Sequence, residues 1–169
     1  MGLDLSWQSS GVCIWAGGKN PVRLSAAIAT APADGPDLSR LDEILTQVQM
    51  MICDHNVAVT VIEGYAFNKA TNLTRLGELG GIIKYFLYSD ERPYTVVTPS
   101  ASKKYATGNG NANKNMMVDA AKPWLPDLRY KDHDKADALH LARFGYDRVL
   151  PVFDRVGASG ILTHSWSGA

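Results

Sequence analysis

The sequence predicts an α/β domain with a mixed sheet, in which three antiparallel strands are followed by parallel ones and helices flank the sheet. Three observations support this fold class. Residues 1–30 contain three strand-like segments joined by short turns, as in an antiparallel meander. An amphipathic helical segment then leads into an apolar, β-branched run, which is typical of a buried parallel strand. Helical and strand segments alternate from there to a last long helix.

The strand-like segments are short, apolar and bounded by turn residues. The five predicted strands cover residues 1–5, 11–16, 22–30, 57–62 and 94–97. The turn between the second and third strands (GGKN, 17–20) is a strong signal for a β-hairpin. The fourth strand ends at Glu63 and follows a helix, so we expect it to be central and covered on both faces.

The helical segments have apolar residues at three- and four-residue spacing. The predicted helices cover residues 38–55, 72–88, 99–106, 114–124 and 130–150. Asp37 is the expected N-cap of the first helix. We expect one domain over residues 1–155 and a Gly-rich C-terminal tail over residues 156–169.

The composition is that of an ordinary globular chain, with 169 residues of which 46% are hydrophobic and 20% are charged. No run approaches the roughly 18 apolar residues of a membrane span, and the first residues do not resemble a signal peptide, so we expect a cytoplasmic protein without membrane partners. Cys13 and Cys53 lack metal-ligand spacing and are expected to be reduced and buried. The net charge is zero, whereas nucleic-acid-binding proteins usually have an excess of basic residues. A cluster of catalytic acids would, however, cancel part of a basic surface in the net charge.

Four acidic residues occupy positions where a carboxylate is costly without a partner. Asp134 and Asp137 are three residues apart, so they share one face of the last helix, beside apolar residues. Asp4 lies in the first strand, and Glu63 closes the fourth. If the helical crossover places the fourth strand beside the first, the last helix can pack over both strands and the four carboxylates converge.

Converging carboxylates indicate a site for hard divalent cations. Two such ions can hold a phosphodiester, activate a water molecule and stabilise the leaving oxygen. Taken singly, each acid has a simpler interpretation. Asp134 and Asp137 would suit a solvated helix start, and Asp4 and Glu63 would suit the end of a strand. The combination, on this order of strands and helices, favours the metal site.

Four sequence blocks carry a resemblance to a known family: GLDLSWQSSG, VIEGYAF, KKYATGNGNANK and DKADALHLA. With them the chain resembles the RuvC-type Holliday junction resolvases of the RNase H-like superfamily, particularly the short phage forms, over most of residues 1–145. The resemblance implies an RNase H-like fold and a homodimeric endonuclease that cuts opposing strands of a four-way DNA junction. It also implies Mg²⁺ or Mn²⁺ as cofactor, with two ions per site, in the cytoplasm of a bacterial or phage-infected cell.

The resemblance implies that Asp4, Glu63, Asp134 and Asp137 are the catalytic residues and the metal ligands. His133 is an alternative to Asp134 as a ligand, because imidazole also binds transition metals. We prefer Asp134, since its spacing to Asp137 matches the motif.

Three lysines are candidates for contacts to the DNA backbone. Lys103, Lys104 and Lys114 flank a Gly- and Asn-rich loop that could follow sugar and phosphate groups. The resemblance places Lys103 and Lys114 near the scissile region. The alternative is that all three belong to a solvated helix surface.

The loop after Glu63 is expected to face DNA. An aromatic ring there can stack on bases at the junction centre or wedge between them. Phe67 is the first choice for this role and Tyr65 the second, and ordinary core packing is the alternative for both. Lys69 is a further DNA-binding candidate in the same loop.

Other functions are weighed against junction resolution. The nearest is a related RNase H-like nuclease acting on other branched DNA or on RNA–DNA hybrids. A non-catalytic nucleic-acid-binding module would not need all four acids. A sugar-kinase-like phosphotransferase needs a second half that 169 residues cannot supply. We expect a dimer, because paired cuts need two sites, and we predict its interface on helix 72–88 with Leu76, Ile83 and Phe86 exposed.

Overall fold

The protein is seen in a computed structural model that describes residues 1–31, 37–65, 73–152 and 165–166. The strands are β1 (Gly2–Asp4), β2 (Ser9–Trp15), β3 (Val22–Ala29), β4 (Thr60–Glu63), β5 (Tyr94–Val97) and β6 (Ser165–Trp166). The helices are α1 (Asp37–Asp54), α2 (Leu73–Ser89), α3 (Pro99–Thr107), α4 (Lys114–Ala121) and α5 (His133–Phe144), and a π-helical turn, Gly145–Val149, extends α5.

The strands form one mixed sheet in the order β3-β2-β1-β4-β5-β6. The pairs β1–β2 and β2–β3 are antiparallel, and β1–β4, β4–β5 and β5–β6 are parallel. The predicted fold class, in which three antiparallel strands are followed by parallel ones, is therefore confirmed. The sixth strand adds two residues beside β5, within the segment predicted to be a tail.

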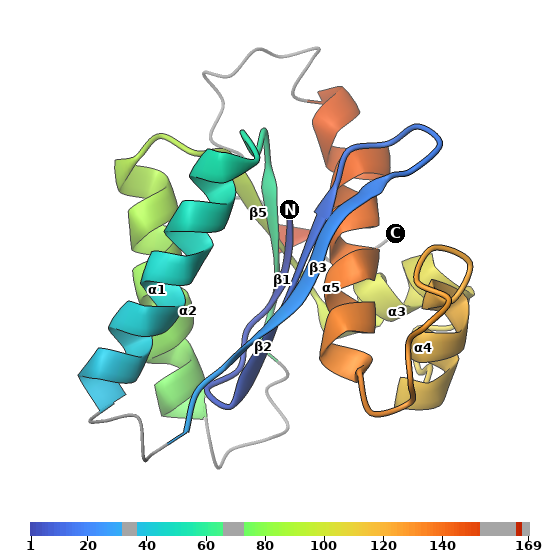
Figure 1. Cartoon of the computed structure of the whole chain (residues 1–169), viewed down its shortest axis with the longest axis horizontal. Coiled ribbons are helices and arrows are strands. Elements are labelled where there is room, and N and C mark those ends of the chain that lie inside the picture. Colours follow the sequence, from blue (N-terminus) through green and yellow to red (C-terminus); the bar gives the residue numbers. More distant parts are fainter. Residues whose placement is uncertain (32–36, 66–72, 153–164, 167–169) are drawn as a thin grey trace.

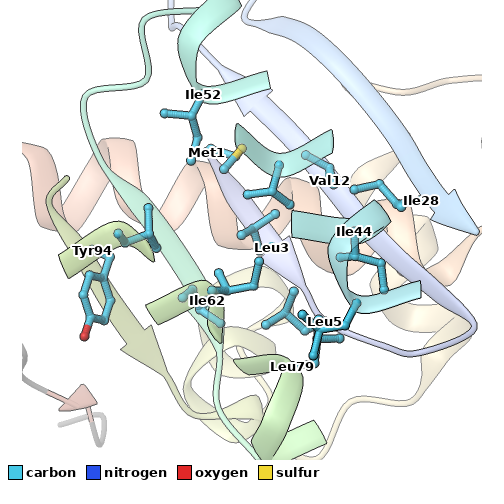
Figure 2. Packing of buried hydrophobic residues seen from close by; sticks show 14 of the residues in the cluster. Met1, Leu3, Leu5, Val12, Ile28, Ile44, Ile52, Ile62, Leu79 and Tyr94 are labelled. Atoms are coloured by element: carbon cyan, nitrogen blue, oxygen red, sulfur yellow. The ribbon is translucent and has the colours of Figure 1, made fainter. Parts of the chain in front are cut away.

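The helices cover the sheet on both faces (Figure 1). α1 and α2 lie on one face, and α5 lies on the other with α3 and α4 beside it. Between the sheet and the helices α1 and α2, the strand residues Leu3, Val12 and Ile62 form one cluster with side chains of both helices, among them Ile44 and Leu79, as Figure 2 shows. Burial of each such side chain stabilises the fold by about 1.5–3 kcal/mol. The central strands are therefore enclosed between two layers of helices.

Two glycines allow α5 to approach the sheet closely. A Cβ atom on Gly2 would lie 2.1 Å from the carbonyl oxygen of Ala138, and one on Gly11 would lie 2.0 Å from that of Asp134. Both distances are far shorter than a non-bonded contact between two atoms, so only glycine fits at either position. The backbone of α5 therefore rests directly on β1 and β2.

The last helix begins later than its sequence pattern suggests. The predicted start was residue 130, but α5 starts at His133, because a turn precedes it in which Asp132 Oδ2 accepts a hydrogen bond from the backbone N–H of Arg129 (3.0 Å). Similarly, Asp37 is the first residue of α1 instead of its N-cap. The fourth strand begins at Thr60, so residues 57–59 belong to the connection that precedes it.

Two predictions of burial were wrong. Cys13 is buried as expected, but Cys53 is exposed, because it follows the core residue Ile52 by one position and so points about 100° away from it. On α2, Ile83 is fully buried, and Leu76 and Phe86 pack against the core.

The exposed side of α2 carries large aromatic residues instead. Tyr85 and Tyr88 are 69% and 60% exposed, so they, and not the residues predicted from the sequence, form the outer apolar surface of this helix. Within the described residues, no helix has the length and hydropathy of a membrane span.

Candidate active site

Asp4 and Glu63 lie together at one edge of the sheet. They are the last residues of β1 and β4, which are parallel neighbours, and Leu3 pairs with Ile62 directly before them. The carboxyl ends of adjacent parallel strands form the usual binding edge of an α/β sheet. A cavity of about 150 Å³ opens here, with Asp4, Glu63 and Pro99 in its lining.

The first turn of α5 lies over the same edge. The backbone of Asp134 packs on Gly11, and Gly11 is the cross-strand partner of Asp4. Asp137 follows one turn later on the same side of the helix. The predicted convergence of the acids from β1, β4 and α5 is therefore present in the structure.

The carboxylates raise one another's pKa. Burial is the largest cause at Asp4, whose pKa is well above its ordinary value, and the charges of Glu63, Asp137 and Asp134 raise it further. Burial and the charge of Asp137 raise the pKa of Glu63 to about 7. Burial, together with Asp134, raises the pKa of Asp137 to about 6. The site thus concentrates negative charge in partly dehydrated surroundings, and a cation there would relieve the repulsion.

Two of the three predicted lysines lie close enough to the acids to lower their pKa values. Lys103 on α3 lowers the pKa values of Glu63 and Asp137. Lys114, the first residue of α4, lowers those of Asp4 and Asp137. Lys104 is exposed on α3 and is not among the groups that shift the pKa of these acids.

His133 lies beside Asp134 at the start of α5, and the two side chains are about equally exposed (28% and 29%). Its Nε2 is 3.9 Å from Asp134 Oδ1, and its Nδ1 is 3.3 Å from the carbonyl oxygen of Tyr130. Its charge lowers the pKa of Asp137. His133 is therefore close to the two aspartates of α5, whereas Asp134 also acts on Asp4 in the sheet.

Tyr65 packs against α2. A Cβ atom on Gly80 would lie 1.8 Å from the Tyr65 hydroxyl oxygen, and Lys84 Nζ is 5.7 Å from the centre of the ring. This is the packing alternative considered for Tyr65, and it holds the start of the loop after Glu63 against the helix. Phe67 and Lys69 lie outside the described residues.

Sequence reasoning missed one residue that shapes the site. Gly11 was assigned only to a strand, yet it determines how closely Asp134 approaches Asp4. A glycine inside a strand pattern often marks a close backbone approach. This signal was present in the segment GVCIWA.

The donor set fits a hard divalent cation, since carboxylate oxygens are the ligands that Mg²⁺ and Mn²⁺ prefer. Across the described parts of the chain, no three His, Cys, Asp or Glu side chains are already positioned to hold one ion. The acids are close enough to perturb one another electrostatically, and their side chains must draw together before three of them can share an ion. The fit therefore rests on the chemistry of the donors and on their shared edge of the sheet.

The β3-β2-β1-β4-β5 core with acids on β1, β4 and the covering helix defines the class of the protein: it has an RNase H-like fold with an acidic site at the carboxyl edge of its sheet. Residues 1–143 match the family model of the crossover junction endodeoxyribonuclease RuvC. The chain therefore belongs to the RuvC family. The predicted family and the predicted class of enzyme, an endodeoxyribonuclease, are confirmed.

Individual relatives agree with this assignment. RuvC of Mycobacterium avium is 30% identical over 148 residues, which cover 84% of this chain and 78% of that protein. RuvC of Gloeobacter violaceus is 26% identical over 132 residues, which cover 78% and 76% of the two proteins.

Two solved structures share the fold. Thermus thermophilus RuvC superposes with a TM-score of 0.65 at 18% identity, covering 85% of this chain and 95% of that one. The same enzyme in complex with a Holliday junction substrate gives a TM-score of 0.70 at 17% identity, covering 87% and 93%. At these identities the likeness concerns the fold alone.

Proposed function

We propose that the chain resolves four-way DNA junctions as a divalent-metal-dependent endonuclease that cuts two opposing strands. Family membership supports the reaction. One observation supports the site: carboxylates from β1, β4 and α5 raise one another's pKa at the carboxyl edge of the sheet. Like charges in such surroundings are unfavourable unless protons or a cation neutralise them.

We assign the metal ligands to Asp4, Glu63, Asp134 and Asp137, with Mg²⁺ or Mn²⁺ as the ion and two ions per site. Bound ions of this kind orient the phosphodiester, lower the pKa of the attacking water and stabilise the leaving oxygen. Asp134 is favoured over His133, because Asp134 acts on both Asp4 and Asp137 whereas His133 acts on Asp137 and not on Asp4.

We assign the phosphate contacts nearest the acids to Lys103 and Lys114, whose charges already act on the carboxylates. Lys104 is a more distant candidate on the outer side of α3. Phe67 and Lys69 keep their predicted roles in base stacking and DNA binding. The packing of Tyr65 against α2 supports Phe67 as the first choice for the stacking residue.

A homodimer follows from the need for two cuts, and we place its interface on the outer side of α2. Gly77, Gly81, Tyr85 and Tyr88 recur there at helical spacing, and a Cβ atom on either glycine would meet nothing within 4 Å. This stripe leaves open space over the two glycines, beside two exposed aromatic rings. Tyr85→Glu should yield monomers in light scattering, and Met50→Glu, at an exposed position on α1, serves as the matched control.

Cleavage of a synthetic four-way junction tests the function. With Mg²⁺ or Mn²⁺ the wild type should produce paired nicks, and Asp4→Asn and Asp137→Asn should abolish them, whereas Asp127→Asn, at an exposed acid, should cut normally. Equal cutting by the wild type and the site variants would refute the metal site. Fork, flap and RNA–DNA hybrid substrates are assayed alongside, and preference for one of these would refute junction resolution while leaving the nuclease activity.

The bacterial relatives also support a cytoplasmic location.

A further inference from the structure

His140 is a fully buried histidine on α5 that the cleavage site does not use. Its Nε2–H donates a hydrogen bond to the backbone carbonyl oxygen of Met117 on α4 (3.0 Å). Because a carbonyl oxygen can only accept, the proton is on Nε2 and the orientation of the ring is defined. Nδ1 is also buried and has no hydrogen-bond partner among the described residues. Burial lowers the pKa of His140, so the ring is neutral at pH 7.

Burial of a polar histidine side chain costs free energy, which its hydrogen bond offsets only in part. We therefore expect the hydrogen bond to have a structural role. The seam between α4 and α5 is otherwise apolar and includes Val118, Ala121 and Ala136. Apolar contacts are not directional, so they fix the position of one helix along the other less strictly than a hydrogen bond does. The hydrogen bond of His140 is directional and fixes the register.

The hydrogen bond joins the two helices one turn away from their active-site ends. Met117 follows Lys114 by three residues on α4, and His140 follows Asp137 by three residues on α5, so each pair shares a helix face. Lys114 in turn lowers the pKa of Asp137. A shift of α4 along α5 would therefore move Lys114 directly relative to the acids.

We propose that His140 is a positioning residue for strand cleavage: its hydrogen bond to the backbone of α4 holds Lys114 at its working distance from Asp137. The inference rests on the function proposed above. His140 itself is fully buried and cannot touch DNA. Its contribution to the reaction passes through Lys114.

Two substitutions separate the hydrogen bond from packing. His140→Leu fills the site without a donor, whereas His140→Gln retains a nitrogen at the position of Nε2. In single-turnover cleavage of a saturating junction complex, His140→Leu should cut about tenfold more slowly, since small misplacements of catalytic groups are costly. His140→Gln should restore most of the rate, and junction affinity should change less than about twofold in both variants.

Val118→Ala is the control for packing. Val118 is fully buried in the same seam, so its truncation should lower the melting temperature by several degrees while the cleavage rate stays within about twofold of wild type. A loss of rate in Val118→Ala equal to that in His140→Leu would overturn the proposal, because loosened packing would then be the cause.

A double-mutant cycle tests the route through Lys114. Lys114→Ala should slow cleavage strongly in the wild-type background and much less in the His140→Leu background, since the lysine is already misplaced there. Independent, multiplicative effects would overturn the proposal. So would a His140→Leu variant that cleaves at the wild-type rate.

Binding of Mn²⁺, measured by calorimetry, provides a second readout that does not require cleavage. Removing the charge of Lys114 should tighten Mn²⁺ binding about fivefold in the wild-type background, and the gain should shrink when His140 is leucine. An equal gain in both backgrounds would overturn the positioning role. A wild-type chain that leaves junctions uncut would refute the proposed function, and the Mn²⁺ cycle would still decide the role of His140.

Discussion

Glu63→Gln should make the metal-free protein more stable above neutral pH while abolishing cleavage. Glu63 is placed among other acids at the end of β4, and burial and Asp137 raise its pKa from 4.5 to about 7. The ionised carboxylate is therefore unfavourable in the folded chain without a cation. Glutamine keeps the shape of the side chain and removes the charge.

The size of the effect follows from the pKa values. One pKa unit corresponds to about 1.4 kcal/mol, so the ionised Glu63 costs the fold up to ~3 kcal/mol at pH 8. The pKa of Glu63 in the folded state lies above its unfolded value. The contribution of protonated Glu63 to the free energy of unfolding is therefore fully present below pH 4.5. It is lost as the pH rises through about 7. The glutamine variant has no such loss.

Urea unfolding in the presence of a chelator, at pH 5 and pH 8, measures this difference. The wild type and Glu63→Gln should differ by less than about 1 kcal/mol at pH 5. At pH 8 the variant should be more stable by about 1–3 kcal/mol, with an unchanged slope against urea. Glu78→Gln, at an exposed position on α2, is the control. Added Mn²⁺ should stabilise the wild type more than Glu63→Gln.

Two results would refute this reasoning. The first is equal stability of the wild type and Glu63→Gln at pH 8, since a buried and repelled carboxylate must lower stability there. The second is a wild type that gains stability relative to the variant as the pH rises. In the second case Glu63 would have a favourable cationic partner, and the site would not need a metal ion.

Two further predictions concern the shape and charge of the site, and a third concerns a buried arginine of the core. Gly11→Ala should lower the free energy of unfolding by about 1–3 kcal/mol in urea titrations and cut junctions at least tenfold more slowly, because its Cβ would overlap the carbonyl oxygen of Asp134. Lys103→Ala should slow cleavage more than Lys104→Ala, measured at equal salt, because Lys103, unlike Lys104, acts on the acids. Equal losses would contradict this. Arg40→Ala should lower the melting temperature by about 5–15 °C in calorimetry, since the buried guanidinium donates to Thr30 and to the Trp7 carbonyl oxygen.

The site was predictable because its residues break local rules. Asp4 in an apolar strand, Glu63 at the end of another and two aspartates on one helix face are each unfavourable alone. Their convergence then required that β4 lie parallel beside β1, which a helical crossover produces, and that the last helix pack over both strands. The pairing of β1 with β4 bears this out.

Other features could not be read from the sequence, for physical reasons. On α2, the pairs Ile82-Ile83 and Phe86-Leu87 present apolar residues on adjacent faces, and Gly77 and Gly81 weaken the periodicity, so the inner face was assigned incorrectly. Strand β6 contains two residues, which is too short to carry a pattern. The pairing of His140 with a backbone oxygen has no local signal at all, because it depends on the packing of α4.

The division of the acids between the first strand and the last helix has a consequence for the newborn protein. Asp4 leaves the ribosome first, whereas Asp137 emerges only after roughly 10 s of synthesis. A truncated or half-made chain therefore lacks the acids of α5, and a complete chain lacks the assembled site until that helix docks. The fold thus delays assembly of the cleavage site until α5 has docked on the sheet.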